Sequence, residues 1–475
     1  MPPEPAPTRV QRAPATRDQA DAYRFGLRRM EAALVRADPV LRHEQIRSQR
    51  RAVFAGVLAG LLALGVAALL ARVSPAADWR THALVQGETS GVLYAVATDP
   101  PRLVPVPDPV AGRLVLAALG RSDGAGAVPA RVPDAELAAA PRTPPAAVPG
   151  AVGVALDGAP VPAAWAVCDT ADDEGRAPGV ATVLAGSLAP GPHEPAPMLL
   201  LTGEGGATYL VHDGGRHRLD PADRDVLAGL GLLDAPVRRV GEGLLSAIPE
   251  GAPLRMPAPD PVDVPGLGRA GDVVESQPLG APAAYYLVVD GGLAQVPVTL
   301  ADAAVSRTGQ GQPTVLTPRR VRDATVTSVP GADAWPERPA TPGAGAGPVL
   351  CRTWREGQGG VLAADRLPVA PGSVPVALAG ADGGGPRLDE VVLPSSGPGP
   401  LRAVGAESAT PGADGSGTRW LLAASGAVYG VADDPTAAAL GIVESGAAPE
   451  AMVRLLPRAG ALDVAAAGEV ADIPG

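Results

Sequence analysis

The sequence contains no lysine, so all 39 of its Lys/Arg positions are arginine. A nucleotide site of the Walker type depends on a lysine that contacts the phosphates, and this absence excludes that class of site. Aromatic residues make up only 3% of the chain, which leaves few rings to stack on sugars once the hydrophobic cores are filled. The net charge of −11 argues against nucleic acid as a partner.

The sequence contains short motifs that resemble catalytic or cofactor-binding ones, but their sequence surroundings do not fit those functions. Residues 120–124 match G-x-S-x-G, but a helix-like stretch precedes them and a loop follows, whereas a nucleophile elbow joins a strand to a helix. Residues 266–271 match G-x-G-x-x-G with no helix after them, which argues against a dinucleotide fold. His212 and His217 flank a turn and could bind a metal, but we interpret them as solvated edge residues. We therefore expect no catalytic residue, no metal and no cofactor.

One long apolar segment, VFAGVLAGLLALGVAALLA, occupies residues 53–71. As a helix its 19 residues span about 28 Å, close to the thickness of a bilayer core. Basic residues are concentrated just before it, namely Arg42, Arg47, Arg50 and Arg51. The positive-inside bias therefore favours a cytoplasmic N-terminus and an exported remainder. The alternative is a buried helix of a soluble core, against which the lack of any polar residue argues.

An amphipathic helix is predicted before this segment, from about residue 16 to Asp38, because Pro39 disfavours further helix. Apolar residues at steps of four, three and four form one stripe on it. The stripe consists of Tyr23, Leu27, Met30 and Leu34. A helix alone in the cytoplasm must cover such a stripe with a protein partner or with the membrane surface. We favour protein docking because the stripe is narrow and includes tyrosine and methionine.

Four later segments share a pattern of strand, glycine-containing turn and second strand. They begin at Gly91, Thr208, Tyr285 and Trp420. In two of them the turn is Asp-Gly-Gly, a strong hairpin signal. Ala/Leu-rich stretches that suit short helices follow, as at residues 222–233 and 435–443. We interpret the pattern as four small α/β units.

The order of these units indicates two related halves, each with two hairpins and one of the two cysteines. A tryptophan lies three residues from each cysteine, Trp165 from Cys168 and Trp354 from Cys351. We infer a mixed β core with a pseudo-two-fold axis, at which the cysteines could meet. Because both lie on the predicted exported side, a disulfide is the expected state, and two buried free thiols are the alternative.

The predicted fold class is an N-terminal cytoplasmic helix, one transmembrane helix, and an extracytoplasmic α+β domain of four small repeats around a β core with pseudo-two-fold symmetry. The expected segments are a disordered tail at 1–15, the amphipathic helix and basic flank at 16–52, the membrane span at 53–71 and the extracytoplasmic domain at 72–475. Inside that domain we expect repeats near 84–145, 200–260, 272–335 and 400–470, and core strands near 150–195 and 345–395.

Several segments taken together are specific to one family. The most specific is ATRDQADAYRFGLRRMEAALVRAD at residues 15–38, followed by IRSQRRAV and the apolar run. Later segments are PRTPPAAVPGA at Pro141, WAVCD at Trp165, TVLAG at Thr182, YLVHDGGRHRL at Tyr209, LLSAIPEGAPL at Leu244 and VLCRTW at Val349. Over nearly its whole length the chain resembles EccB, the single-pass membrane component of the actinobacterial type VII (ESX) secretion system. Gly26, where the family usually has a bulkier apolar residue, and the Gly/Pro-rich region 381–415 depart from the pattern.

The resemblance implies a structural membrane subunit that anchors and organises the translocation complex through its extracytoplasmic domain. It also implies a disulfide between the two cysteines. The implied partners are the EccC motor ATPase, EccD, EccE and the mycosin protease, and we expect a homo-oligomer. EccB is sometimes described as an ATPase, but this sequence has no phosphate-binding loop and we expect no enzymatic activity. A membrane-tethered cell-wall (peptidoglycan) binding protein is the alternative function, which the scarcity of aromatic residues disfavours.

Overall fold

The computed structural model describes residues 16–36, 43–73, 78–146, 148, 150–171, 178–190, 198–258, 260, 262–340, 347–383, 387–405 and 417–469. In the two N-terminal helices, side chains are described at 16–35 and 49–69. The chain divides into two compact units, Met1–Ala76 and Ala77–Gly475.

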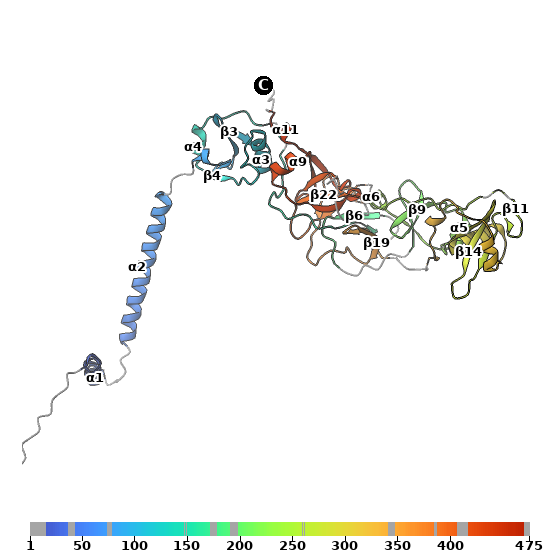
Figure 1. Ribbon diagram of the computed structural model, residues 1–475. Helices are drawn as coiled ribbons and strands as arrows, with labels where there is room; N and C mark the ends of the chain where they lie inside the picture. The colour runs from blue at the N-terminus through green and yellow to red at the C-terminus, as the bar shows by residue number, and fades with distance from the viewer. Residues whose placement is uncertain are drawn as a thin grey trace, which may run out of the picture. The chain divides into compact units, whose positions relative to one another are not determined.

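The first unit consists of helices α1 (Arg17–Arg36) and α2 (His43–Val73) (Figure 1). α1 begins with a capping box, in which the Gln19 N–H donates to Thr16 Oγ1 at 3.4 Å and the Thr16 N–H donates to Gln19 Oε1 at 3.1 Å. The predicted start of this helix is therefore correct. Asp38 and Pro39, which were expected to end it, lie outside the described residues.

The second unit contains, within the described residues, four small sheets that share one connectivity. In each, three consecutive strands form an antiparallel meander, and a later strand pairs in parallel with the first of them. The first sheet, in spatial order, is β3 (Pro101–Val106), β2 (Leu93–Thr98), β1 (Leu84–Gly87) and β4 (Ala130–Val132). The second is β10 (Val237–Arg239), β7 (Leu199–Thr202), β8 (Thr208–His212) and β9 (Gly215–Leu219).

The other two small sheets carry a further parallel strand beside the third strand of the meander. The third sheet is β16 (Thr314–Val315), β13 (Val273–Ser276), β14 (Ala284–Val289), β15 (Gly292–Val296) and β17 (Val326–Thr327). A short hairpin, β11 (Asp263–Val264) and β12 (Gly268–Arg269), precedes it. The fourth is β25 (Gly446–Pro449), β22 (Pro400–Val404), β23 (Arg419–Leu422), β24 (Val428–Val431) and β26 (Arg458–Leu462).

One helix connects each meander to its parallel strand, namely α3 (Pro109–Ala118), α5 (Arg224–Gly229), α7 (Val298–Thr308) and α9 (Asp434–Leu440). The other helices of this unit follow the parallel strands; they are α4 (Asp134–Ala139), α6 (Glu242–Ala247), α8 (Pro318–Asp323), α10 (Glu450–Val453) and α11 (Val464–Ala467). Single 3₁₀ turns lie at Trp79–Thr81 and Ala332–Ala334. The four hairpins and the two short helices expected from the sequence are present, the helices as α5 and α9.

A six-stranded central sheet is built from both halves of the chain. Its order is β19 (Gln358–Ala364), β18 (Val349–Arg355), β5 (Ala164–Ala171), β6 (Pro178–Leu184), β21 (Glu390–Val392) and β20 (Val376–Ala377). β5 and β18 run antiparallel, in a register that places Cys168 opposite Cys351 and Trp165 opposite Trp354. Trp165 precedes its cysteine whereas Trp354 follows its own, so the antiparallel register brings the two tryptophans together.

Three large hydrophobic cores hold the unit together. One joins the central sheet to α6, α10 and the fourth small sheet. The second is shared by the first and fourth small sheets, and the third by the second and third small sheets. The first and fourth sheets therefore form one packed pair, and the second and third form another.

Candidate functional site

The predicted stripe on α1 is uncovered along the described part of this helix. Its residues Tyr23, Leu27, Met30 and Leu34 are 69%, 45%, 59% and 87% exposed. A polar helix with an exposed apolar stripe lacks a core of its own to bury that stripe. Phe25 is also exposed, but it lies two residues, or about 200°, from Tyr23 and therefore on the opposite side of the helix.

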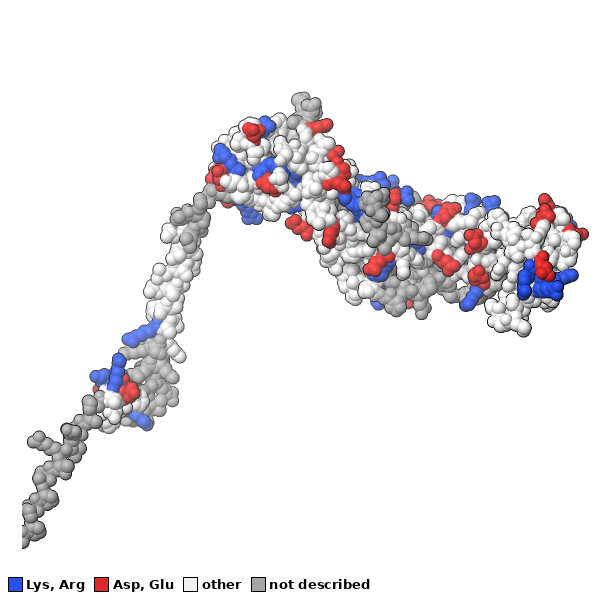
Figure 2. Space-filling model, in the orientation of Figure 1, with Lys and Arg blue, Asp and Glu red and all other residues white. Residues whose placement is uncertain are grey.

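The described part of α2 has the length and composition of a membrane-spanning helix. The span Gln49–Leu69 contains an 18-residue window with a mean hydropathy of 2.4, none of which is buried in the chain. Along its described side chains, residues 49–69, Figure 2 shows charge only near the N-terminal end, where it is basic. Arg50 and Arg51 are exposed there, whereas Arg42 and the side chain of Arg47 lie outside the described residues.

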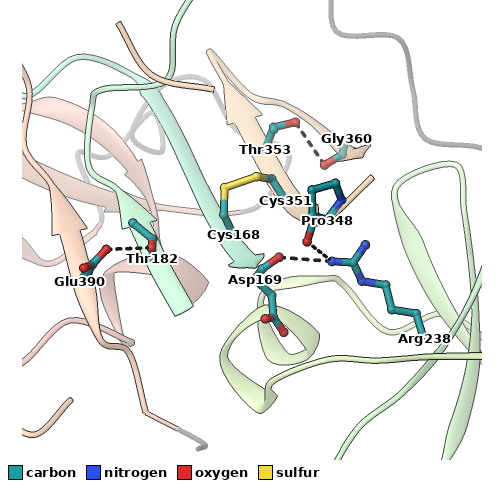
Figure 3. The surroundings of a disulfide bond; sticks show 9 residues. All are labelled: Cys168, Asp169, Thr182, Arg238, Pro348, Cys351, Thr353, Gly360 and Glu390. Atoms are coloured by element: carbon teal, nitrogen blue, oxygen red, sulfur yellow. Dashed lines mark hydrogen bonds between the residues drawn. A yellow bond between two sulfur atoms is a disulfide. The ribbon is translucent and has the colours of Figure 1, made fainter. Parts of the chain in front are cut away.

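The two cysteines form a disulfide between β5 and β18, in the middle of the central sheet (Figure 3). Both are fully buried, in a small cluster with Ala166, Leu184 and Val349. The pairing expected from the sequence is thus present, and the alternative of free thiols is wrong.

Next to the disulfide lies a buried carboxylate, Asp169, which is only 1% exposed. Its Oδ2 accepts the Gly241 N–H at 2.5 Å, while its Oδ1 has no hydrogen-bond partner among the described residues. Burial raises the pKa of this carboxyl to about 6, although the Gly241 hydrogen bond and Arg238 oppose the shift; the Asp389 carboxylate adds to it.

Arg238 of β10 donates to backbone oxygens near the start of β18, to Gly347 at 2.6 Å. It also donates to Pro348 at 2.7 Å (Figure 3). Asp389 is buried too, but three backbone N–H groups satisfy it, those of Ala181, Asp382 and Gly383 at 2.6–2.8 Å. These buried charges were not predicted from the sequence. The available signal for Asp169 was its position, an acidic residue directly after the apolar run from Trp165 to Cys168.

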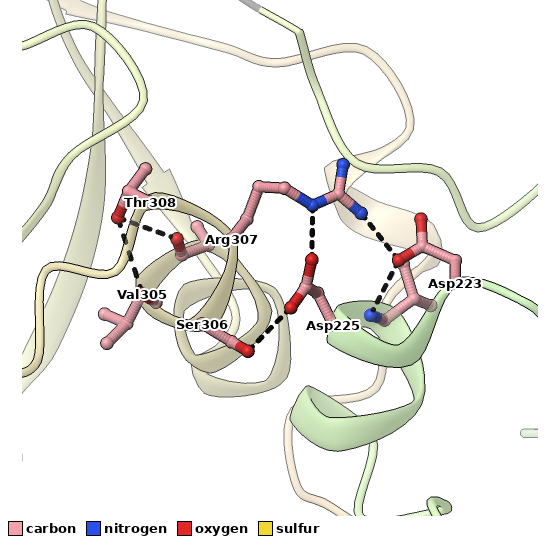
Figure 4. A network of polar contacts seen from close by, with 8 residues as sticks. Asp223, Asp225, Val305, Ser306, Arg307 and Thr308 are labelled. Carbon is pink, nitrogen blue, oxygen red and sulfur yellow. Dashed lines mark hydrogen bonds and ion pairs between the residues drawn. The ribbon is translucent and has the colours of Figure 1, made fainter.

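The second and third small sheets are fastened through α5 and α7. Arg307 of α7 donates to Asp225 at 2.5 Å and to Asp223 at 2.6 Å, both on the N-terminal side of α5 (Figure 4). At the other end of α5, a Cβ on Gly229 would lie 2.4 Å from the Thr299 carbonyl oxygen, so the two helices are in backbone contact there.

His212 is not a solvated edge residue, so that interpretation is wrong for it, whereas His217 lies half-buried on the edge strand β9. The His212 side chain is 9% exposed and its Nε2 lies 2.9 Å from the Ala334 carbonyl oxygen. The His217 ring stacks on it at 4.5 Å and bonds through Nδ1 to the Ala252 carbonyl oxygen. Burial lowers the pKa of His217. No group of three metal-ligating side chains occurs in the described part of the chain.

The two glycine motifs also lie in non-catalytic surroundings. Residues 120–124 form a loop directly after α3. Residues 266–271 belong to the β11–β12 hairpin and its exit, with β13 rather than a helix next.

The chain matches the family model "Type VII secretion system ESX-1, transport TM domain B" over residues 12–473. It is 29% identical to the "ESX-5 secretion system ATPase EccB5" of Mycobacterium tuberculosis H37Rv, over 94% of this chain and 91% of that protein. Among solved structures it is similar to a chain of an intact ESX-5 inner membrane complex, with a TM-score of 0.68, 27% identity, and coverage of 98% of this chain and 97% of that chain. It is also similar to a chain of a periplasmic assembly from the ESX-5 inner membrane complex, with a TM-score of 0.67, 26% identity, and coverage of 85% and 97%. A third similar structure is an EccB3 dimer from the ESX-3 core complex, with a TM-score of 0.65, 26% identity, and coverage of 81% and 99%.

Proposed function

The chain belongs to the EccB family of type VII secretion membrane proteins, and we propose that it anchors and organises the translocation complex through its extracytoplasmic domain. It is a structural subunit of type VII secretion. The observation that carries this conclusion is the match of the whole chain, membrane helix included, to a subunit of an intact ESX inner membrane complex. The proposed orientation has the N-terminus in the cytoplasm and residues 72–475 outside, supported by the arginines before the span.

α1 is the proposed cytoplasmic docking element. The exposed stripe of Tyr23, Leu27, Met30 and Leu34 supports docking on a protein. The proposed partners are the other membrane subunits, EccC, EccD and EccE, with the mycosin protease on the extracytoplasmic side. A homo-oligomer is also proposed, and the solved EccB3 dimer supports it.

The test is to replace Tyr23, Leu27 and Leu34 together with serine. At about 1.5–3 kcal/mol per large buried side chain, the loss should release the protein from its complex while α2 keeps it in the membrane. The matched control replaces Asp18, Asp21 and Ala32 with serine on the opposite side of α1, and this variant should stay bound. Co-purification of the stripe variant with the other membrane subunits, at the level of the control, would contradict docking through α1.

We further propose that the four small sheets are repeats of one unit, with a pseudo-two-fold axis near the disulfide. Their shared connectivity supports the repeat. The central order β19-β18-β5-β6 supports the axis, because one hairpin lies on each side of the Cys168–Cys351 pair. The tryptophans lend no support, because they occupy opposite sides of their cysteines in sequence. Such a scaffold would offer several packed surfaces to neighbouring subunits.

The proposed role is structural and not enzymatic, although the relatives are named ATPases. The absence of lysine from the whole sequence supports this, because a Walker loop cannot form without it. Purified protein, free of the motor subunit, should hydrolyse no more ATP than a buffer blank, and hydrolysis that tracks the protein through purification would contradict the proposal.

A further inference from the structure

The chain between β6 and β18 of the central sheet forms the second and third small sheets. These two sheets share a hydrophobic core and are fastened by α5 and α7, so they make one body, which we call the inserted pair (residues 199–340). The inserted pair contacts the central sheet through the strands and helix of the second small sheet, and α6 packs on β5 and β18.

We call the contact between the inserted pair and the central sheet the joint. Polar contacts cross the joint at three places. Arg352 of β18 donates to the Gly214 carbonyl oxygen at 2.9 Å, in the turn between β8 and β9. Arg238 of β10 donates to Gly347 and Pro348, and the Gly241 N–H at the start of α6 donates to Asp169. All three involve an ionisable side chain, and hydrogen bonds of that kind are stronger than neutral ones when desolvated.

Two members of this set are incompletely satisfied among the described residues: Arg238, whose Nε has no hydrogen-bond partner, and Asp169, the only acid of the set. Its Oδ1 is buried without a partner among the described residues, and the one hydrogen bond that they give its carboxylate comes from the Gly241 N–H. The nearest cation, Arg238, directs its donors to backbone carbonyls, the Asp169 carbonyl at 3.4 Å included. A second buried carboxylate, Asp389, raises the cost of a negative charge here. Charged groups on the elements around the joint include Arg352 on the neighbouring strand, Glu242 at the start of α6, and Arg216, which donates to the Leu245 carbonyl oxygen of α6 at 2.6 Å.

We propose that Asp169 makes the joint proton-responsive, so that the inserted pair is held more tightly to the central sheet when this carboxyl is protonated. In the closed joint the charged form is buried with one oxygen unsatisfied, and a proton removes that cost. In the open joint water solvates the carboxylate. The Gly241 N–H still donates to the neutral carboxyl, so the contact geometry is kept.

The direction and the size of the pH effect follow from the linkage between proton binding to Asp169 and closing of the joint. The pKa of Asp169 is about 6 in the closed joint and returns to 3.8 when solvated. The closed state binds the proton more tightly, so closing is favoured progressively as pH falls from about 6 towards 4. Between pH 7.5 and pH 5 the closing equilibrium should strengthen about tenfold, and above pH 7 it should barely change. A domain outside the cytoplasm meets such changes in acidity directly.

Hydrogen exchange of the full chain in detergent tests this. After correction for intrinsic exchange rates, the protection of α6 at pH 5 should exceed that at pH 7.5 about tenfold relative to α9, which lies in the fourth small sheet and serves as an internal reference. A relative change below about twofold in the wild-type chain overturns the proposal without any variant.

Two variants test whether the pH dependence of α6 protection comes from Asp169. Asp169→Asn keeps the shape and the acceptor for Gly241, and it should abolish the pH dependence of α6; a variant that keeps the tenfold change overturns the proposal. Asp389→Asn removes the neighbouring negative charge and should move the midpoint of the α6 transition to lower pH. A midpoint that stays in place or moves up would contradict the placement of these two carboxylates in one electrostatic unit.

Discussion

Replacing Cys168 and Cys351 with alanine should lower the stability of the second unit by about 5 kcal/mol. The disulfide closes a loop of 183 residues, and the chain-entropy relation gives that figure for the freedom the unfolded chain regains. The second unit, Ala77–Gly475, has 475 − 76 = 399 residues. At about 2.1 cal/mol/K of unfolding entropy per residue, its unfolding entropy is about 0.8 kcal/mol/K, so the Tm should fall by about 6 °C.

The assay is thermal unfolding followed by intrinsic fluorescence, since Trp165 and Trp354 lie fully buried in the same strands as the cysteines. The matched control is Val349→Ala in the same small core, which costs packing but no cross-link; at about 0.8 kcal/mol per buried CH₂ it should lower the Tm by about 2 °C. Reduction of the wild-type protein should reproduce the double variant. A double variant that melts no lower than Val349→Ala would refute the reasoning that the cross-link acts on the unfolded chain.

Three further outcomes are expected. Gly229→Ala should destabilise the inserted pair by about 1–3 kcal/mol, because its Cβ would lie 2.6 Å from the Ala303 nitrogen. The control Gly126→Ala has open space around the new Cβ and should leave the stability unchanged in the same thermal unfolding experiment. Arg307→Ala should cost less than about 1 kcal/mol by denaturant unfolding, since its side chain is 44% exposed to screening water; a larger loss would show that the ion pairs to Asp223 and Asp225 are more than surface contacts. A reporter active only in the cytoplasm should work at the N-terminus and one active only outside should work at the C-terminus, and the reverse pattern would overturn the proposed orientation.

Local signals predicted the elements that depend on local physics. The stripe from Tyr23 to Leu34 predicted α1, and the uncharged run at 53–71 predicted the hydrophobic part of α2. The Asp213–Gly214 turn predicted the β8–β9 hairpin, and both residues have the positive φ values that such tight turns require. The cysteine pairing could be expected because the sequence offers no third cysteine.

Features that depend on distant contacts were not predictable in this way. The parallel edge strands β4, β10 and β16 have two or three residues each, too few to show a period of two. The surroundings of Asp169 are supplied by Gly241, Arg238 and Asp389, all at least 69 residues away in sequence. His212 was misjudged for the same reason, since the Ala334 carbonyl that binds it lies 122 residues away.

We propose that this chain works inside a membrane secretion complex to which α1 docks. Amine-reactive crosslinkers are poorly suited to test it because the chain has no lysine. A photo-reactive amino acid at Met30, in the stripe, should instead crosslink in native membranes to the other membrane subunits of the secretion complex, while the same group at Asp21, on the opposite side of α1, should give little such product. Crosslinks from Met30 to lipid alone, or equal protein crosslinking from both positions, would contradict the account.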